Sequence, residues 1–188
     1  QRRAELTSSV VRGSRRYQSR PDSHQQCLDT VRKSDIENFL CMPFVPSECL
    51  NPLVAIRAFN VEVGKSADKA KDSKLIEIRL QWWRNAVESF QGGKPPYHPV
   101  VDSLCEAFHT HQLDIDLLLS VIDRRIEDLD VPHMETMAKL EAYARGTQGA
   151  LAQLSLHVLG AHTPPHNLEA AEHVGTAAGL CLLLRFTR

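Results

Sequence analysis

The chain has 188 residues, of which 43% are hydrophobic and 24% charged, and its formal net charge is −1. This size and composition are typical of one globular domain with a sizeable core. Six of the 22 basic residues fall within residues 1–20 beside a single acid, so the rest of the chain is acidic and no nucleic-acid-binding surface is expected.

The first 21 residues are rich in arginine and serine and poor in acids. This composition is typical of a mitochondrial presequence. We therefore interpret residues 1–21 as the remnant of a presequence, and a disordered basic tail is the alternative. Residues 22–188 are expected to form one helical domain. The arginines of the leader are Arg2, Arg3, Arg12, Arg15, Arg16 and Arg20.

Apolar residues at helical spacing, separated by proline and glycine, predict helices along the whole domain. No alternating strand pattern and no hairpin turn signal is present, so the predicted class is all-α. The predicted inner faces are Leu75–Ile78–Trp82–Val87 in the third helix and Ala170–Val174–Ala177–Leu180 in the last. Gly64 and the charged run after it are expected to end the second helix. The expected helices span about 22–39, 47–63, 74–90, 99–109, 114–130, 134–159 and 167–184.

Membrane-spanning and metal-binding segments are not expected. No run reaches the roughly 18–20 apolar residues needed to cross a bilayer, so any membrane association should be peripheral. The five cysteines are scattered, without zinc spacing, and are expected to be free thiols. Asp123, Glu127 and Asp130 share one helix face, which we expect to be solvated and countered by Arg124 and Arg125.

Five motifs occur in an order that identifies a family. They resemble, in turn, the A-L-Y-A-F run, the L-A-W-W-R-D-E signature, the L-I-D segment, the tyrosine helix and the second Asp-rich motif of the squalene/phytoene synthase family. The resemblance implies an isoprenoid-synthase-like helical bundle, truncated at its C-terminal side by about a third of the usual fold. The motifs are A-I-R-A-F (55–59), R-L-Q-W-W-R-N-A (79–86), V-I-D-R-R-I-E-D-L-D (121–130), Y-A-R-G-T-Q-G (143–149) and H-V-G-T-A-A-G-L-C-L-L-L-R (173–185).

The Asp-rich motifs themselves depart from the family pattern. In active members, their carboxylates hold Mg²⁺ against a substrate diphosphate. The first alignment places Gly64, Lys65 and Asp68 at the three Asp positions, and a second possible register places Asn60 at the first of them. The resemblance therefore implies no catalytic residue, no cofactor and no bound metal, with Tyr143 as a possible pocket residue. In the second Asp-rich motif the aligned positions are Gly179, Leu182, Arg185 and Phe186.

One branch of the family matches more closely. The leader, R-A-F-N-V-E in place of aspartates and the C-L-x-x-R ending resemble mitochondrial proteins that help to build respiratory complex I. The resemblance implies a non-catalytic role in early assembly, on the matrix side of the inner membrane. The implied partners are a membrane-arm subunit of complex I or other assembly factors. The alternatives are a module that binds a prenyl lipid or isoprenoid diphosphate, and a residual prenyltransferase.

Overall fold

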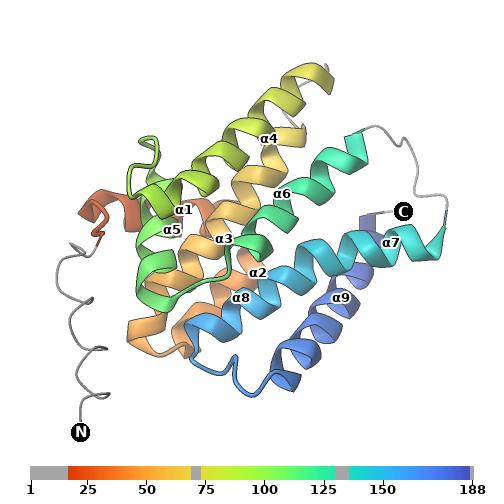
Figure 1. Ribbon diagram of the computed structural model, residues 1–188. Helices are drawn as coiled ribbons and strands as arrows, with labels where there is room; N and C mark the ends of the chain where they lie inside the picture. The colour runs from red at the N-terminus through yellow and green to blue at the C-terminus, as the bar shows by residue number, and fades with distance from the viewer. Residues whose placement is uncertain (1–16, 69–72, 130–135, 187–188) are drawn as a thin grey trace, which may run out of the picture.

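The structure is a computed structural model that describes residues 17–68, 73–129 and 136–186. Within these ranges all regular elements are helices, which confirms the predicted all-α class (Figure 1). Short 3₁₀ turns follow α2 and α4, and a π-helical turn joins α7 to α8. The helices are α1 (Pro21–Ser34), α2 (Ile36–Cys41), α3 (Ser47–Asp68), α4 (Ser73–Glu88), α5 (Pro99–His111), α6 (Ile115–Leu129), α7 (Met137–Ala144), α8 (Ala150–Val158) and α9 (His166–Phe186).

Helix α3 lies at the centre of the bundle. It packs against α1 and α5, and also against α4, α6 and α8 (Figure 1). Its middle turns bury Ile56 and Phe59 completely, together with Leu104 of α5, Ile122 of α6 and Leu154 of α8. Burial of such side chains is the main favourable term in folding. The core therefore holds α3 in place, and this fixes the directions of the side chains on the other faces of the helix.

The first predicted helix is interrupted. The structure ends α1 at Ser34 and starts α2 at Ile36, because Asp35 adopts a non-helical backbone with φ −142° and ψ 60°. Its carboxylate accepts a hydrogen bond from the side-chain amide of Asn38 at 2.8 Å. Short polar side chains of this kind compete with the helical pattern by bonding locally.

The second predicted helix is longer than expected. Helix α3 continues through Gly64 to Asp68. Two local contacts support its last turns: the Lys65 ammonium pairs with Glu62 at 3.0 Å, and the Ser66 hydroxyl donates to the Glu62 carbonyl. Because glycine weakens a helix by only about 1 kcal/mol, these contacts and the packing of α3 are enough to carry the helix past it.

Two predicted inner faces are wrong, except at Val87 of α4, which is buried. Helix α4 buries Ile76, Leu80 and Trp83, whereas Leu75 and Ile78 are 50% and 65% exposed. In α9 the predicted stripe is largely exposed, and Val174 is 70% exposed. The residues that face inward on α9, Gly175, Thr176 and Gly179, are small, so hydrophobicity alone selected the wrong side.

Helix α9 packs closely against the π-helical turn Arg145–Gly149 through glycines. A Cβ atom on Gly175 would overlap the Gln148 carbonyl oxygen and lie 2.8 Å from the Gly149 Cα atom. A Cβ on Gly179 would lie 3.1 Å from the Cβ of Ala144. Glycine, which has only a hydrogen atom as its side chain, allows the backbones of α9 and the π-helical turn to approach this closely.

No helix among the described residues combines the length and apolarity that crossing a membrane requires.

Candidate functional site

The positions aligned with the first Asp-rich motif lie along the second half of α3, where Asn60 and Gly64 are one turn apart on one face and Lys65 lies on another. Asn60 points toward α6, where it meets Arg125. Gly64, four residues later, has open space beside it, since nothing lies within 4 Å of where its Cβ would be. Lys65 lines a different pocket of about 230 Å³ with Glu62, Ser66 and Arg79 of α4. Asp68 ends the helix, and its side chain lies outside the described part.

A guanidinium group occupies the space next to Asn60. Arg125 of α6 donates one hydrogen bond to the Asn60 Oδ1 atom at 2.6 Å and another to the Val121 carbonyl at 2.7 Å. Burial lowers the pKa of Arg125, and the Tyr143 phenol interacts with it electrostatically in the opposite direction. Arginine remains charged under such conditions. A fixed protein cation therefore lies against α3 at the start of the aligned motif.

A second arginine lies one turn earlier. Arg57 and Asn60 are three residues apart on α3, so they are neighbours along the helix surface. Burial lowers the pKa of Arg57, opposed by the nearby carboxylate of Asp35 and by the Cys41 thiol. Neither Arg57 nor Arg125 was predicted from the sequence to be a site residue. The sequence A-I-R-A-F-N contained one indication: it places a basic residue, Arg57, among the apolar residues of a helix that is expected to be buried.

The second aligned motif lies at the end of α9. Leu182 is half-buried, and Arg185, 64% exposed at its side chain, pairs with Glu37 of α2 at 3.0 Å. Phe186 is the last residue of α9, and its side chain lies outside the described part. Within the described ranges, Lys65 pairs with Glu62 of its own helix and Arg185 pairs with Glu37 of α2. Neither ion pair joins the two aligned motifs.

Two acids of the predicted acidic face of α6 are paired with arginines. Glu127 pairs with Arg124 at 2.7 Å, as predicted. Asp123 instead forms an ion pair with Arg84 of α4, and Arg125 turns toward α3 as described above. Asp130, the third acid of the predicted face, lies outside the described residues. No group of three or more His, Cys, Asp or Glu side chains in the described ranges is placed to hold a metal ion.

The aligned tryptophans serve packing. Trp83 is 5% exposed and meets the rings of Phe59 and His98 edge-on at 5.8 and 5.0 Å. Trp82 is 39% exposed and contacts Trp83 at 5.1 Å. Such edge-to-face contacts add to the burial of the rings. Tyr143 is half-buried on α7, beside the π-helical turn.

The fold of this chain resembles that of a solved structure. The crystal structure of a dehydrosqualene synthase in complex with ligand aligns with a TM-score of 0.70 over 83% of this chain and 53% of that chain. The two sequences are 20% identical, so the likeness concerns the fold.

Two mammalian proteins show clear sequence similarity. Both are named NADH dehydrogenase (ubiquinone) complex I, assembly factor 6; one comes from Rattus norvegicus and the other from Mus musculus. Each is 40% identical over 167 residues, which are 89% of this chain and 50% of the relative. The chain thus spans about half the length of these curated relatives.

The family model for squalene/phytoene synthase matches residues 31–187, a range that includes all five motifs named from the sequence. The predicted resemblance is confirmed by this match and by the shared helical fold, and the chain belongs to the squalene/phytoene synthase family.

Proposed function

We propose that this protein is a non-catalytic mitochondrial factor that helps to assemble respiratory complex I. It acts in early assembly on the matrix side of the inner membrane, where it associates peripherally. Its partners are a membrane-arm subunit of complex I or other assembly factors. The assembly role is supported by the names of the relatives that are 40% identical over most of this chain.

The proposal that the protein is non-catalytic is supported by the side chains at the positions aligned with the first Asp-rich motif. Mg²⁺ prefers oxygen ligands, and in phosphate-transferring sites it is held by carboxylates together with the substrate. At the aligned positions α3 supplies a hydrogen atom at Gly64 and an ammonium at Lys65, and in the other register the amide of Asn60. Asp68 supplies the one carboxylate.

The charges around these positions also oppose a metal. The Arg125 guanidinium is bound to the Asn60 oxygen, the atom that would have to turn toward a cation. Two like charges a few ångströms apart repel strongly inside a protein. The residues present therefore do not fit a Mg²⁺–diphosphate site, and we derive no catalytic step through one.

The decisive cellular experiment is depletion of the protein in its own organism. We expect assembled complex I, measured on native gels, to fall, while the other respiratory complexes and the levels of quinone and carotenoid-like lipids stay unchanged. Re-expression of the wild type and of Asp68→Ala should restore complex I equally, because no step uses that carboxylate. Unchanged complex I after depletion contradicts the proposal.

A test with purified protein addresses catalysis directly. We expect no condensed product on incubation with farnesyl or geranylgeranyl diphosphate and Mg²⁺. A product that disappears in the Asp68→Ala variant would show that the protein is a transferase.

A second candidate function is binding of a prenyl lipid without turnover. The observation that favours it is the open space beside Gly64 on α3, next to the half-buried side chains of Arg57 and Asn60. Binding of a prenyl lipid that Gly64→Leu abolishes, with assembly of complex I unaffected by depletion, would favour this candidate over the first.

A further inference from the structure

A pocket of about 160 Å³ lies where α1, α3 and α5 pack against one another. The residues of α5 that line it are spaced i, i+3, i+4, i+7 and i+8, so they form one face of that helix. Ser103 and Ala107 are buried at its floor, whereas Glu48, Asn51 and Thr110 are exposed at its rim. The pocket is therefore accessible from solvent, and it is larger than the roughly 10–15 Å³ that one water molecule requires.

Two residues that line the pocket hold a buried polar atom without a hydrogen-bond partner in the described part of the chain. These atoms are the Ser103 hydroxyl oxygen and the His24 Nδ1 atom. Ser103 is 1% exposed, and the neighbouring Cys27 thiol is at most a weak partner for its hydroxyl. A buried polar group without a partner costs as much free energy as a lost hydrogen bond or more. Unsatisfied groups in the wall of a pocket therefore indicate a polar ligand that supplies the missing partners.

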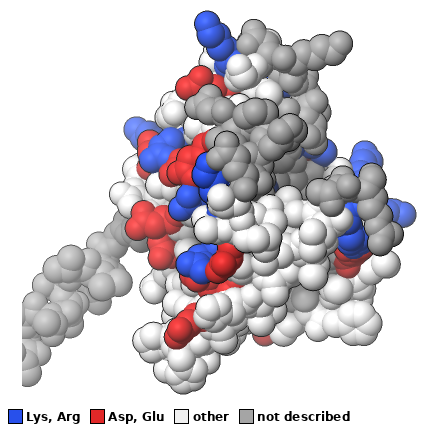
Figure 2. All heavy atoms as spheres, turned by 90° about the vertical axis from the view of Figure 1, so that its right-hand side faces the viewer, with Lys and Arg blue, Asp and Glu red and all other residues white. Residues whose placement is uncertain are grey.

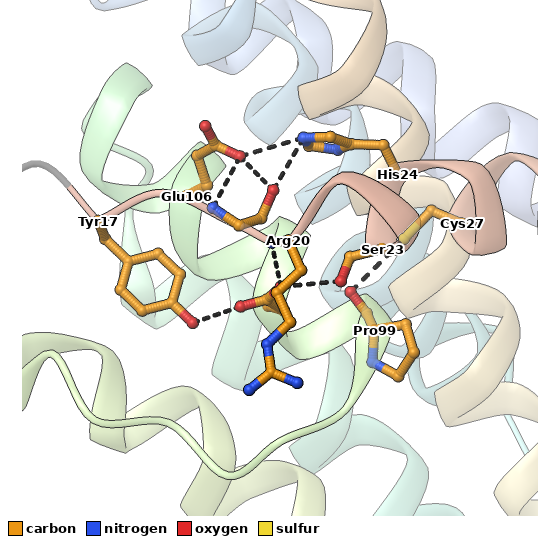
Figure 3. A network of polar contacts seen from close by, with 9 residues as sticks. Tyr17, Arg20, Ser23, His24, Cys27, Pro99 and Glu106 are labelled. Carbon is orange, nitrogen blue, oxygen red and sulfur yellow. Dashed lines mark hydrogen bonds and ion pairs between the residues drawn. The ribbon is translucent and has the colours of Figure 1, made fainter.

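The contacts of His24 determine which of its nitrogens can accept a hydrogen bond (Figure 3). Its Nε2 atom lies 3.1 Å from a carboxylate oxygen of Glu106 and 2.8 Å from the Ser19 hydroxyl oxygen. That hydroxyl donates its own proton to the same Glu106 oxygen at 2.5 Å. Because an ionised carboxylate only accepts, Nε2 carries the ring proton. In the neutral ring, the buried Nδ1 atom is then an acceptor.

The lining of the pocket is negative and rich in acceptors. Among the described residues it contains the carboxylates of Glu48 and Glu106 and no lysine or arginine, so its charge stays negative even when one imidazole is protonated. The hydroxyls of Ser103 and Thr110 and the carbonyl of Asn51 add neutral acceptors. Both carboxylates would repel an anion. A metal ion is not expected, because no group of three His, Cys, Asp or Glu side chains in the described ranges is placed to hold one.

We propose that this pocket binds a primary ammonium group, carried by a small amine or by a lysine side chain. An ammonium has three N–H donors and no acceptor, which matches a wall of carboxylate, hydroxyl and imidazole acceptors. Its hydrogen bonds to carboxylates are charge-assisted and therefore among the stronger ones. Pro52 and the buried methyl group of Ala107 offer apolar surface to the methylene groups beside the ammonium. This ligand site goes beyond the proposed function and does not depend on it.

The test uses the purified full chain, labelled for nuclear magnetic resonance, and butylammonium as the probe. We expect saturable chemical-shift changes at the amides of the residues that line the pocket, with a dissociation constant in the millimolar range. Butanol has no charge and tetramethylammonium has no N–H donor, so each should bind at least about tenfold more weakly. The absence of saturable changes with butylammonium would mean that water alone fills the pocket. That result, or an equal response to butanol or tetramethylammonium, overturns the inference.

Variants of the two carboxylates test the wall of the pocket. Glu106→Gln keeps the size of the side chain and should weaken butylammonium binding about tenfold, because a hydrogen bond to a charged acceptor is lost. Glu48→Gln changes an exposed side chain at the rim, so the fold is kept, and it should weaken binding about threefold. Glu88→Gln, 48% exposed on α4 and outside the lining, makes the same change in net charge and should stay within about twofold of the wild type. Unchanged binding in both pocket variants overturns the inference.

A second ligand distinguishes the two sources of the ammonium group. Nα-acetyl-lysine amide reproduces a lysine within a polypeptide, whereas butylammonium represents a free amine. Tighter binding of the lysine derivative assigns the pocket to a lysine of a partner protein, and tighter or equal binding of butylammonium assigns it to a free amine. Both results support an ammonium site, and failure of both ligands to bind overturns it.

Discussion

At the scale of single residues, Gly175 is where α9 comes nearest to the π-helical turn. A Cβ there would overlap the Gln148 carbonyl and meet Gly149 Cα at 2.8 Å, and both are backbone atoms that cannot turn aside. We expect Gly175→Ala to lower the free energy of unfolding by about 2 kcal/mol or more, because overpacking forces the helices apart. Urea denaturation followed by circular dichroism measures this loss.

Gly64→Ala is the matched control for this prediction. Gly64 is also a helical glycine, but its Cβ would meet nothing within 4 Å. Alanine in a helix is about 1 kcal/mol more favourable than glycine, so the variant should be as stable as the wild type or slightly more stable. If both variants behaved alike, the close packing of α9 on the π-helical turn would be contradicted.

The cysteines should fall into two classes of reactivity. Cys41 and Cys181 are exposed, whereas Cys27, Cys49 and Cys105 are buried. Burial raises the pKa of Cys27 to about 11 and that of Cys105 to about 12. Because the thiolate is the reactive form, both stay unreactive at pH 8. Thiol labelling of native protein should modify Cys41 and Cys181 quickly and the other three only on unfolding; rapid labelling of all five would contradict the buried positions.

Asp102 should make stability depend on pH. Burial alone would raise its pKa, but hydrogen bonds from Tyr17, the Arg20 N–H and Ser23 outweigh burial and hold the pKa below its usual value. The stability this carboxylate provides is therefore present above the unfolded pKa of about 3.9 and is lost as the pH falls through the folded pKa.

The measurement compares the wild type with Asp102→Asn across pH. At pH 7 the variant should be less stable by about 1–3 kcal/mol, since the hydrogen bonds to a charged acceptor are lost. The difference should stay constant down to about pH 4 and shrink below it. A difference that grew on acidification would contradict the ionised, hydrogen-bonded state of Asp102.

At the scale of helices, the Asn60–Arg125 contact joins α3 to α6 inside the bundle. Removing one partner leaves the other half-buried without its hydrogen bond, so Asn60→Leu should cost about 1–3 kcal/mol. The double variant Asn60→Leu/Arg125→Met removes both partners and should recover part of that loss. A double-mutant cycle by urea denaturation gives the coupling energy.

An exposed amide provides the control for this cycle. Asn85 of α4 accepts a hydrogen bond from Gln81 on the surface at 2.9 Å. Asn85→Leu should change stability by less than about 0.5 kcal/mol, because water replaces the lost partner. Equal effects at Asn60 and Asn85 would show that the α3–α6 contact contributes nothing specific.

Helix positions were predictable because proline, glycine and apolar spacing are local signals. The faces of α4 and α9 were not. On α9 the inner face is made of Gly175, Thr176 and Gly179, which carry little hydrophobicity, while Val174 points outward. The break at Asp35 depends on one side-chain hydrogen bond to Asn38. Packing between distant segments decides the inner faces of α4 and α9, whereas a local side-chain contact accompanies the break at Asp35. Apolar periodicity contains neither.

At the scale of the whole molecule, the family and the all-α bundle were predictable because five motifs recur in order. The pairing of Asn60 with Arg125 was not, since 65 positions separate the two residues and either could have faced solvent. The hydrogen bond from Tyr17 to Asp102 of α5 was not predicted for the same reason, since the two residues are 85 positions apart. Two statements stay predictions: that the protein is non-catalytic, and that the positions aligned with the Asp-rich motifs bind no metal. These positions are Gly64, Lys65, Asp68, Leu182, Arg185 and Phe186.

The second half of α9 carries few charges. Residues 173–184 contain no Asp, Glu, Lys or Arg, and uncharged side chains predominate over the lower part of the face shown in Figure 2. Val174 and Leu184 are 70% and 62% exposed on α9. Exposed apolar side chains along one helix favour association. We therefore expect this 188-residue chain to self-associate, with an apparent mass in light scattering that rises with concentration.

Polar substitution on α9 should reverse the association. Val174→Gln together with Leu184→Gln should lower the apparent mass at a given concentration without changing the melting temperature, because neither side chain is buried. Leu159→Gln, at a position 46% exposed just after α8, is the control and should leave association unchanged. A wild-type chain that is monomeric and melts cooperatively at every concentration would show that exposed apolar groups on α9 do not drive contacts between copies.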